Sequence, residues 1–116
     1  VLRPGVEIGA KIVTGLRVLN ITGESPIKDV FRISMPYWKG DSLGRYSWDQ
    51  TAVLIAAKGT KLFFNTVKGR MIVHADGSNE WVNDSNGQHE YVTFNMPAGE
   101  LTRIIEDAML HQPAAK

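Results

Sequence analysis

The run from Thr51 to Lys58 limits most strongly what this chain can fold into, because its residues are apolar on almost every side. Ser47-Trp48-Asp49-Gln50 precedes the run as a capping box, in which the serine hydroxyl accepts from an amide three residues on and Gln50 reaches back. Gly59 follows as a natural stop. A helix that is apolar all round belongs in an interior. We therefore predict a helix that needs cover on every side.

The composition indicates one globular unit and excludes several classes of function. The chain has 116 residues, of which 43% are hydrophobic and 22% charged, which is too apolar for disorder. Its net charge of +1 excludes a broad polycationic surface for nucleic acid. The absence of cysteine excludes disulfides, thiolate metal sites and cysteine nucleophiles. No apolar run approaches the roughly 18 residues of a membrane span, so we expect a soluble protein, cytoplasmic or periplasmic, without a membrane partner.

The N-terminal part predicts helical structure around one short strand. Residues 6–8 read as a strand that turns into a helix over residues 9–19, whose apolar residues recur at helical spacing. Ser25-Pro26 predicts a second helix, because a cap residue is followed by the residue best tolerated in a first turn, and Pro36 ends it. Residues 36–46 are expected to form a loop that is rich in glycine and aromatic residues.

The C-terminal part predicts a small meander and a last helix. Residues 62–67 and 70–75 read as two strands joined by a tight turn at Lys68-Gly69. Residues 90–94 read as a third strand. Pro97 opens an amphipathic helix, which we expect to point three apolar residues inward: Leu101, Ile104 and Ile105.

Asp49 is the residue whose context points most clearly to chemistry. It lies in the first turn of the apolar helix, where the positive helix end and the orphan amides favour a carboxylate in its charged form. The simpler interpretation is a surface charge that stabilises the helix start. Four aromatic residues nearby offer flat apolar surfaces of the kind that stack on sugars or bases, although the same side chains fit the packing of a long loop: Tyr37, Trp38, Tyr46 and Trp48.

Several short motifs together resemble a known family. They are Gly5-Val6-Glu7-Ile8-Gly9, Thr14-Gly15, Ser47-Trp48-Asp49-Gln50-Thr51-Ala52-Val53-Leu54, Asp76-Gly77-Ser78-Asn79-x-Trp81 and His89-x-Tyr91. In this order they resemble the C-terminal third of a bacterial branch of the nucleoside hydrolase superfamily, the inosine–uridine-preferring nucleoside hydrolase-like proteins. The resemblance runs from about residue 5 to about residue 110.

The resemblance implies an α/β fold and a calcium site. The fold would be an open, mainly parallel sheet with flanking helices, to which this chain adds a small β-hairpin or meander. Asp49 falls on the family's late calcium-ligand aspartate, and Trp48 falls where the family has a histidine that helps the leaving base depart. Because an indole cannot shuttle a proton at neutral pH, hydrolysis by the same route is in doubt and no catalytic residue is assigned.

The aspartate cluster that supplies most calcium ligands in the family does not occur in this chain. Its pattern, D-x-D-x-x-x-D-D, is missing, and one late aspartate cannot hold a calcium ion that takes six to eight oxygens. Together with the start at Val1, this leads us to expect that residues 1–116 form the C-terminal segment of a single nucleoside hydrolase-like domain. Calcium would bind only in the complete protein, and no tighter than about millimolar to these residues alone.

The leading hypothesis is therefore part of an N-glycosidase that hydrolyses an N-ribosidic or related glycosidic bond with calcium and is inactive as this chain alone. Asp49 would be the metal ligand, Trp48 and Tyr46 the pocket wall, and Glu7, at a strand end, a further substrate-binding residue. One alternative is a non-catalytic sugar- or nucleoside-binding module, and another is a structural domain. The expected partners are a small nucleoside or sugar, the N-terminal part of the same protein, and a second copy in a homo-oligomer. We also expect the helix over 51–58 to leave an exposed apolar patch, or a partner segment to cover it.

Overall fold

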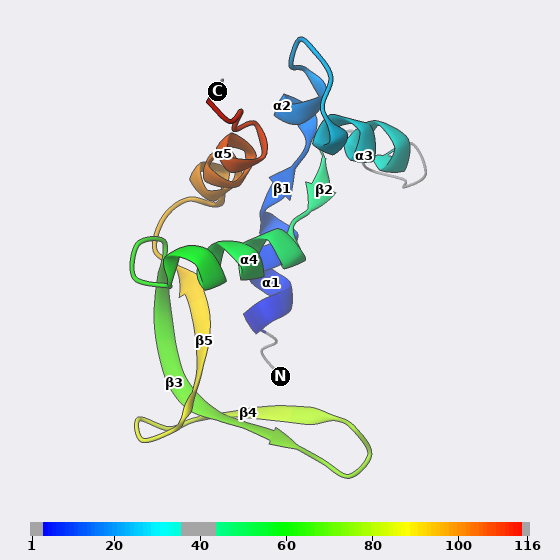
Figure 1. The fold of residues 1–116 in the computed structure, drawn as a ribbon. Helices are drawn as coiled ribbons and strands as arrows, with labels where there is room; N and C mark the ends of the chain where they lie inside the picture. Colours follow the sequence, from blue (N-terminus) through cyan, green and yellow to red (C-terminus); the bar gives the residue numbers. More distant parts are fainter. Residues whose placement is uncertain (1–3, 36–43, 115–116) are drawn as a thin grey trace.

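A computed structural model describes residues 4–35 and 44–114 of the chain (Figure 1). Pro36 and the aromatic residues Tyr37 and Trp38, which the sequence singled out, lie outside the described residues. The elements follow in the order α1 (Pro4–Lys11), β1 (Val13–Thr14), α2 (Leu16–Leu19), α3 (Pro26–Ser34), β2 (Arg45–Tyr46), α4 (Trp48–Lys58), β3 (Phe64–Val73), β4 (Asn79–Asn83), β5 (His89–Phe94) and α5 (Ala98–Met109).

The strands form two small antiparallel sheets, so the predicted open, mainly parallel sheet with flanking helices is wrong. One sheet pairs β1 with β2, and the other has the order β4-β3-β5. Parallel neighbours need a long crossover connection, usually a helix, whereas strands joined by a few residues pair antiparallel. Here β3, β4 and β5 follow one another through short turns, and together they make up the larger sheet. It is not the simple meander that the sequence predicted, because β4 and β5 each pair with a different half of β3.

The predicted strand over residues 6–8 is wrong, because these residues belong to α1. Pro4 opens α1, in the position where a proline fits a helix best. The predicted helix over residues 9–19 is divided instead into the end of α1, strand β1 and the short α2. Gly15 makes this break: its φ of 122° is a conformation that favours glycine, and a Cβ there would lie 2.6 Å from the Phe31 ring.

The predicted tight turn at Lys68-Gly69 is also wrong, because β3 runs through it without interruption. Gly69 pairs with Asn83 of β4 and with His89 of β5, so β3 changes its partner strand at this residue. A Cβ on Gly69 would lie 2.3 Å from the Trp81 ring. Gly69 therefore allows the Trp81 ring to approach the backbone closely, and it does not form a turn. Beyond Gly69, β3 and β4 form a hairpin that projects away from the helices (Figure 1).

Other predicted elements are confirmed. Ser25 caps α3 by accepting a hydrogen bond from the Lys28 amide (3.1 Å), α4 ends at Gly59, and β5 covers the predicted third strand. Helix α5 follows Pro97 and buries Leu101 and Ile105, whereas Ile104, the third residue expected to point inward, is only half-buried.

The capping box at the start of α4 is wrong in its chemistry. Ser47 stands at the cap position, but its hydroxyl is buried and lies 2.7 Å from the hydroxyl of Thr14 in a hydrogen bond across to β1. The side chain at the cap position therefore links α4 to β1. Local sequence rules do not predict such a long-range contact.

The buried core is small and has two parts. The larger part lies between α1, β3 and α5, and the smaller one lies between α2 and α3. The buried residues are Ile8, Ile12, Phe64, Leu101 and Ile105 in the first cluster and Val18, Phe31 and Met35 in the second.

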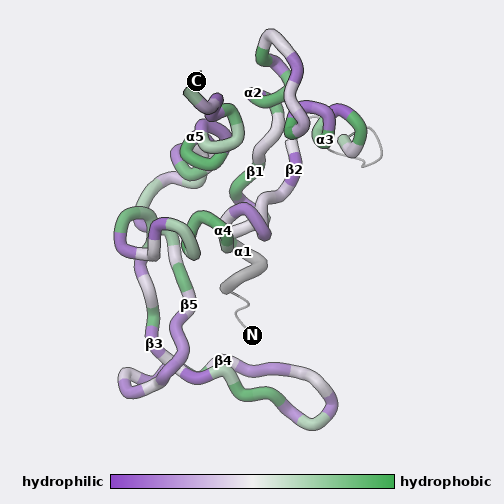
Figure 2. The backbone as a smooth tube through the Cα atoms, viewed as in Figure 1, coloured by the Kyte–Doolittle hydropathy of each residue, from purple (hydrophilic) through white to green (hydrophobic). Residues whose placement is uncertain are grey.

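Helix α4 is not an interior helix, although its sequence predicted one. Among its residues only Thr51 is buried, and the side chain of Val53 is 65% exposed. The middle of α4 is coloured as hydrophobic in Figure 2, on the outside of the molecule. The expected exposed apolar patch on this helix is therefore confirmed.

Polar contacts fix the helices around this core. The carboxylate of Glu106 on α5, only 3% exposed, accepts a hydrogen bond from the Gly15 amide (2.9 Å) and lies 3.5 Å from Arg17. Arg17 also donates to Asp107 (2.7 Å), and this hydrogen bond raises the pKa of the guanidinium. These contacts join α5 to the turn between β1 and α2.

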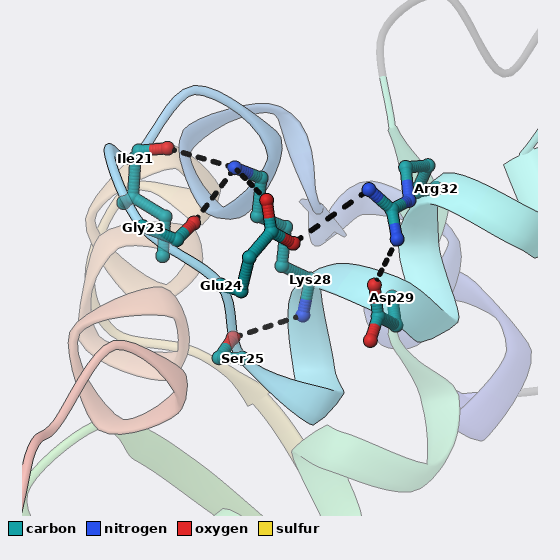
Figure 3. A network of polar contacts seen from close by, with 7 residues as sticks. All are labelled: Ile21, Gly23, Glu24, Ser25, Lys28, Asp29 and Arg32. Atoms are coloured by element: carbon teal, nitrogen blue, oxygen red, sulfur yellow. Dashed lines mark hydrogen bonds and ion pairs between the residues drawn. The ribbon is translucent and has the colours of Figure 1, made fainter.

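A second polar network holds the loop before α3 (Figure 3). The Lys28 ammonium group donates to the carbonyls of Ile21 (3.0 Å) and Gly23 (2.8 Å) and lies 3.8 Å from the Glu24 carboxylate. The ammonium group thus binds back across the loop that leads into its own helix. The network therefore fixes the angle at which α3 leaves the loop.

Candidate functional site

A cavity of about 500 Å³ lies where α3, β2 and the first turn of α4 meet. Its lining combines apolar side chains with polar and aromatic ones. Its lining residues are Ile27, Val30, Phe31, Ser34, Arg45, Tyr46, Trp48, Asp49, Gln50 and Met109. Three of the four site residues predicted from the sequence, Tyr46, Trp48 and Asp49, are therefore brought together.

Tyr46 and Trp48 form the aromatic wall of this cavity. Their ring centroids are 5.2 Å apart in an edge-to-face arrangement, and their residues are 56% and 48% exposed. Trp48 also packs closely on α1, because a Cβ on Gly9 would lie 2.2 Å from the Trp48 ring. The close contact with Gly9 fixes one side of the indole against α1.

Ser47 positions the first turn of α4 and with it the candidate site. Its amide donates to the carbonyls of Gly9 (3.2 Å) and Ile12 (2.9 Å), and its hydroxyl bonds to Thr14. Its carbonyl accepts from the hydroxyl of Thr51. Because Ser47 is held from both sides, the two residues that follow it have a fixed backbone on which to present their side chains.

Asp49 is exposed and lines the cavity, and it lies in the first turn of α4, as the sequence predicted. A carboxylate here is an acceptor for hydroxyl or amide groups, supported by the positive end of the helix. Within residues 4–35 and 44–114, no three histidine, aspartate or glutamate side chains gather closely enough to hold a metal ion. What Asp49 itself offers to a ligand is therefore hydrogen bonding.

Glu7 does not stand at a strand end, because its backbone is part of α1. Its side chain lies outside the described part of the structure. The substrate-binding role predicted for Glu7 therefore loses the location on which it was based.

A second hollow of about 580 Å³ continues from the first along α4. It runs between α4 and α5, and the two hollows share Ile27, Asp49, Gln50 and Met109. Apolar side chains of α4, notably Val53 and Ala57, line it together with Lys58. Asp49 thus stands at the junction of a polar cavity and an apolar groove.

Sequence reasoning missed the contributions of α3 and α5 to the site. Ile27 and Val30 of α3 line the cavity and are both exposed. Met109 ends α5 and meets the cavity from the other side. No local motif signals either contribution, because both depend on how the helices pack.

No described helix is long and apolar enough to cross a membrane. Comparison of the chain with protein-family models, with curated proteins and with solved structures found no significant match.

Proposed function

We propose that this chain is a non-catalytic binding module for a small hydroxylated ligand with a planar group, such as a nucleoside or an aryl sugar. The observation that carries the proposal is that Tyr46, Trp48 and Asp49 line one cavity of about 500 Å³. Ligand sites are commonly apolar hollows of about 300–1,000 Å³ with a few placed polar groups, and this cavity fits that description.

The lining side chains supply complementary contacts for such a ligand. Tyr46 and Trp48 offer ring faces and edges for a base or a sugar ring, and base–aromatic stacking contributes about 1–3 kcal/mol per base. Asp49 accepts hydrogen bonds from ligand hydroxyls, and Gln50 both donates and accepts. Phe31 and Met109 contribute apolar lining.

Calcium-assisted hydrolysis of an N-ribosidic bond, with Asp49 as a metal ligand in a larger domain, stays a prediction from the resemblance. The fold that the resemblance implied is not the fold of this chain, so the cavity itself is the better basis for a function. Binding needs only the stacking and hydrogen-bonding groups that line the cavity.

Calorimetric titration with uridine, adenosine and ribose tests the proposal. We expect a nucleoside to bind more tightly than ribose, because only the nucleoside can stack. Trp48→Ala should weaken nucleoside binding at least tenfold, a change of about 1.4 kcal/mol, and Asp49→Asn should weaken both nucleoside and ribose. Trp81→Phe is the matched control, since Trp81 packs against Tyr91 on the other sheet and not in this cavity.

The same mixtures distinguish binding from hydrolysis. Chromatography of the titrated samples, with and without added calcium, should recover the nucleoside intact. Release of the free base that depends on calcium and on Asp49 would contradict the non-catalytic proposal and support the hydrolase instead. No heat from any of the ligands, or the same affinity after Trp48→Ala, would remove the cavity as the binding site.

A further inference from the structure

The turn between β4 and β5 contains a pair of residues that can react with each other. Asn86 is exposed in this turn and is followed by Gly87. A glycine has no Cβ to keep its amide nitrogen away from the side chain of the residue before it. The nitrogen of Gly87 can therefore reach the side-chain carbonyl carbon, Cγ, of Asn86 and close a five-membered ring. Because both groups belong to one chain, the attack is intramolecular and gains the advantage of proximity.

The reaction needs no reagent other than water. The Gly87 nitrogen forms a bond to Cγ of Asn86 and gives its proton to solvent. The bond from Cγ to the side-chain nitrogen breaks, and that nitrogen takes up a proton and leaves as ammonia. Water then opens the cyclic imide at either carbonyl. One product has aspartate at position 86, and the other has isoaspartate, in which the backbone runs through the former side-chain carbon and is one atom longer.

The structure leaves the side chain of Asn86 free to react. Its backbone amide donates to the Asp84 carboxylate (2.9 Å), but among the described residues no hydrogen bond holds its side-chain amide. The Gly87 amide donates to the Asp84 carbonyl (2.9 Å), so the attack requires this hydrogen bond of an exposed turn to open. The folded chain should therefore react more slowly than an unfolded peptide, but it can react without breaking a contact of the core.

The turn between β3 and β4 shows the opposite arrangement. Asp76 is also followed by a glycine, but its carboxylate accepts hydrogen bonds from the Ser78 amide (2.9 Å) and hydroxyl (2.6 Å). These hydrogen bonds lower the pKa of Asp76 and favour its ionised form, and a carboxylate anion is a poor electrophile. Asp76 is therefore both held in place and unreactive. The remaining asparagines all precede residues that carry a side chain: Asn20, Asn65, Asn79, Asn83 and Asn95.

The longer product changes the junction at which β3 exchanges β5 for β4. The backbone of Gly87 packs directly on that of Gly69, because a Cβ on Gly87 would collide with the Gly69 carbonyl. Gly69 also pairs with His89, whose imidazole Nδ1 accepts a hydrogen bond from the Met71 amide (2.9 Å). A turn that is one backbone atom longer has to displace either the Gly87 contact or the start of β5, which carries His89.

We propose that Asn86-Gly87 is a site of spontaneous deamidation and isomerisation, and that the isoaspartate form loosens the junction between β3 and β5. The proposal does not depend on the proposed ligand, because neither Asn86 nor Gly87 lines the cavity.

Peptide mapping by mass spectrometry during storage in mildly alkaline buffer tests the reaction. We expect aspartate and isoaspartate to form at position 86 at least tenfold faster than at any other asparagine, and faster than Asp76 isomerises. Asn86→Gln is the matched control, since its longer side chain cannot close a five-membered ring and the substitution removes no hydrogen bond of the Asn86 side chain. No product at position 86, or an equal rate at another asparagine or at Asp76, would overturn the proposal.

Hydrogen exchange then tests the loosening of the junction. In aged protein the Met71 amide should exchange at least about threefold faster than in fresh protein, whereas aged Asn86→Gln should show no change. Fresh Asn86→Asp separates the two effects of the reaction, because it adds the charge without lengthening the backbone. Unchanged exchange in the aged protein, or the same acceleration in fresh Asn86→Asp, would contradict loosening by the longer backbone.

Discussion

At the scale of single residues, the glycines most important for stability are those against which another part of the chain packs closely. Gly69 leaves room for the Trp81 ring and for the carbonyl of Val82, which would lie 2.3 Å and 2.4 Å from an added Cβ. Gly69→Ala should therefore lower the free energy of unfolding by about 1–3 kcal/mol, the usual cost of overpacking. Chemical denaturation of the two proteins measures this difference in the free energy of unfolding.

Gly99 is the matched control for that substitution. It lies in α5 and has no atom within 4 Å of an added Cβ. Gly99→Ala should raise stability by about 0.5–1 kcal/mol, because alanine favours a helix over glycine. If Gly69→Ala were as harmless as Gly99→Ala, the close packing of Trp81 on β3 would be wrong.

Glu106 gives a prediction about a buried charge. Glu106→Ala removes the acceptor of the Gly15 amide and leaves that donor unsatisfied in the interior. We expect a loss of about 1–3 kcal/mol. Asp107→Ala, at a neighbouring side chain that is 64% exposed, should change stability by less than about 1 kcal/mol, as exposed ion pairs do. Thermal melts of the two variants compare them directly.

Asp76 gives a prediction about pH. Hydrogen bonds from the hydroxyl and the amide of Ser78 lower the pKa of Asp76 in the turn of the β3–β4 hairpin. The depressed pKa stabilises the folded hairpin above the pKa of the unfolded chain, and this contribution is lost as pH falls through the folded pKa. An NMR titration of the carboxyl carbon should show a pKa below the usual aspartate value, and Ser78→Ala should raise it.

At the scale of elements, the β3–β4 hairpin should be the least protected part of the larger sheet. Its distal half projects from the helices, and Met71 and Val73 are exposed there (Figure 1). Amides of residues 70–73 should therefore exchange with solvent faster than those of residues 64–68, which pair with β5 next to the core. Equal protection along β3 in hydrogen exchange would contradict this division.

The elements also show what the sequence could predict and where it could not. Caps and stops such as Ser25-Pro26, Gly59 and Pro97 act locally, and they placed α3, α4 and α5. Gly69 failed as a signal, because a glycine is favoured by a turn and by close packing alike, and only the position of Trp81 decides between them.

The strand pairing and the candidate site depend on longer-range contacts. The short connections between β3, β4 and β5 favour antiparallel pairing. The parallel sheet was predicted only because the family resemblance implied it. Tyr46, Trp48 and Asp49 were found because they are neighbours in sequence. The α3 and α5 walls were missed because nothing local encodes which helices meet.

At the scale of the whole molecule, the chain is extended, which is consistent with its small core and with the exposed side of α4. The radius of gyration is 16.9 Å, whereas a compact chain of this length has about 13 Å. Small-angle scattering from dilute, monomeric protein should give a value well above the compact one. A value near 13 Å would mean that the hairpin or α4 folds back onto the core.

We propose above all that the cavity between α3, β2 and α4 binds a small ligand with a planar group. The most direct test is an amide NMR titration of the assigned protein with uridine. We predict saturable shifts at Tyr46, Trp48 and Gln50 and at the Trp48 indole, with the indole of Trp81 unmoved. No shift up to millimolar uridine, or shifts centred on Trp81 and Tyr91, would contradict the proposed site.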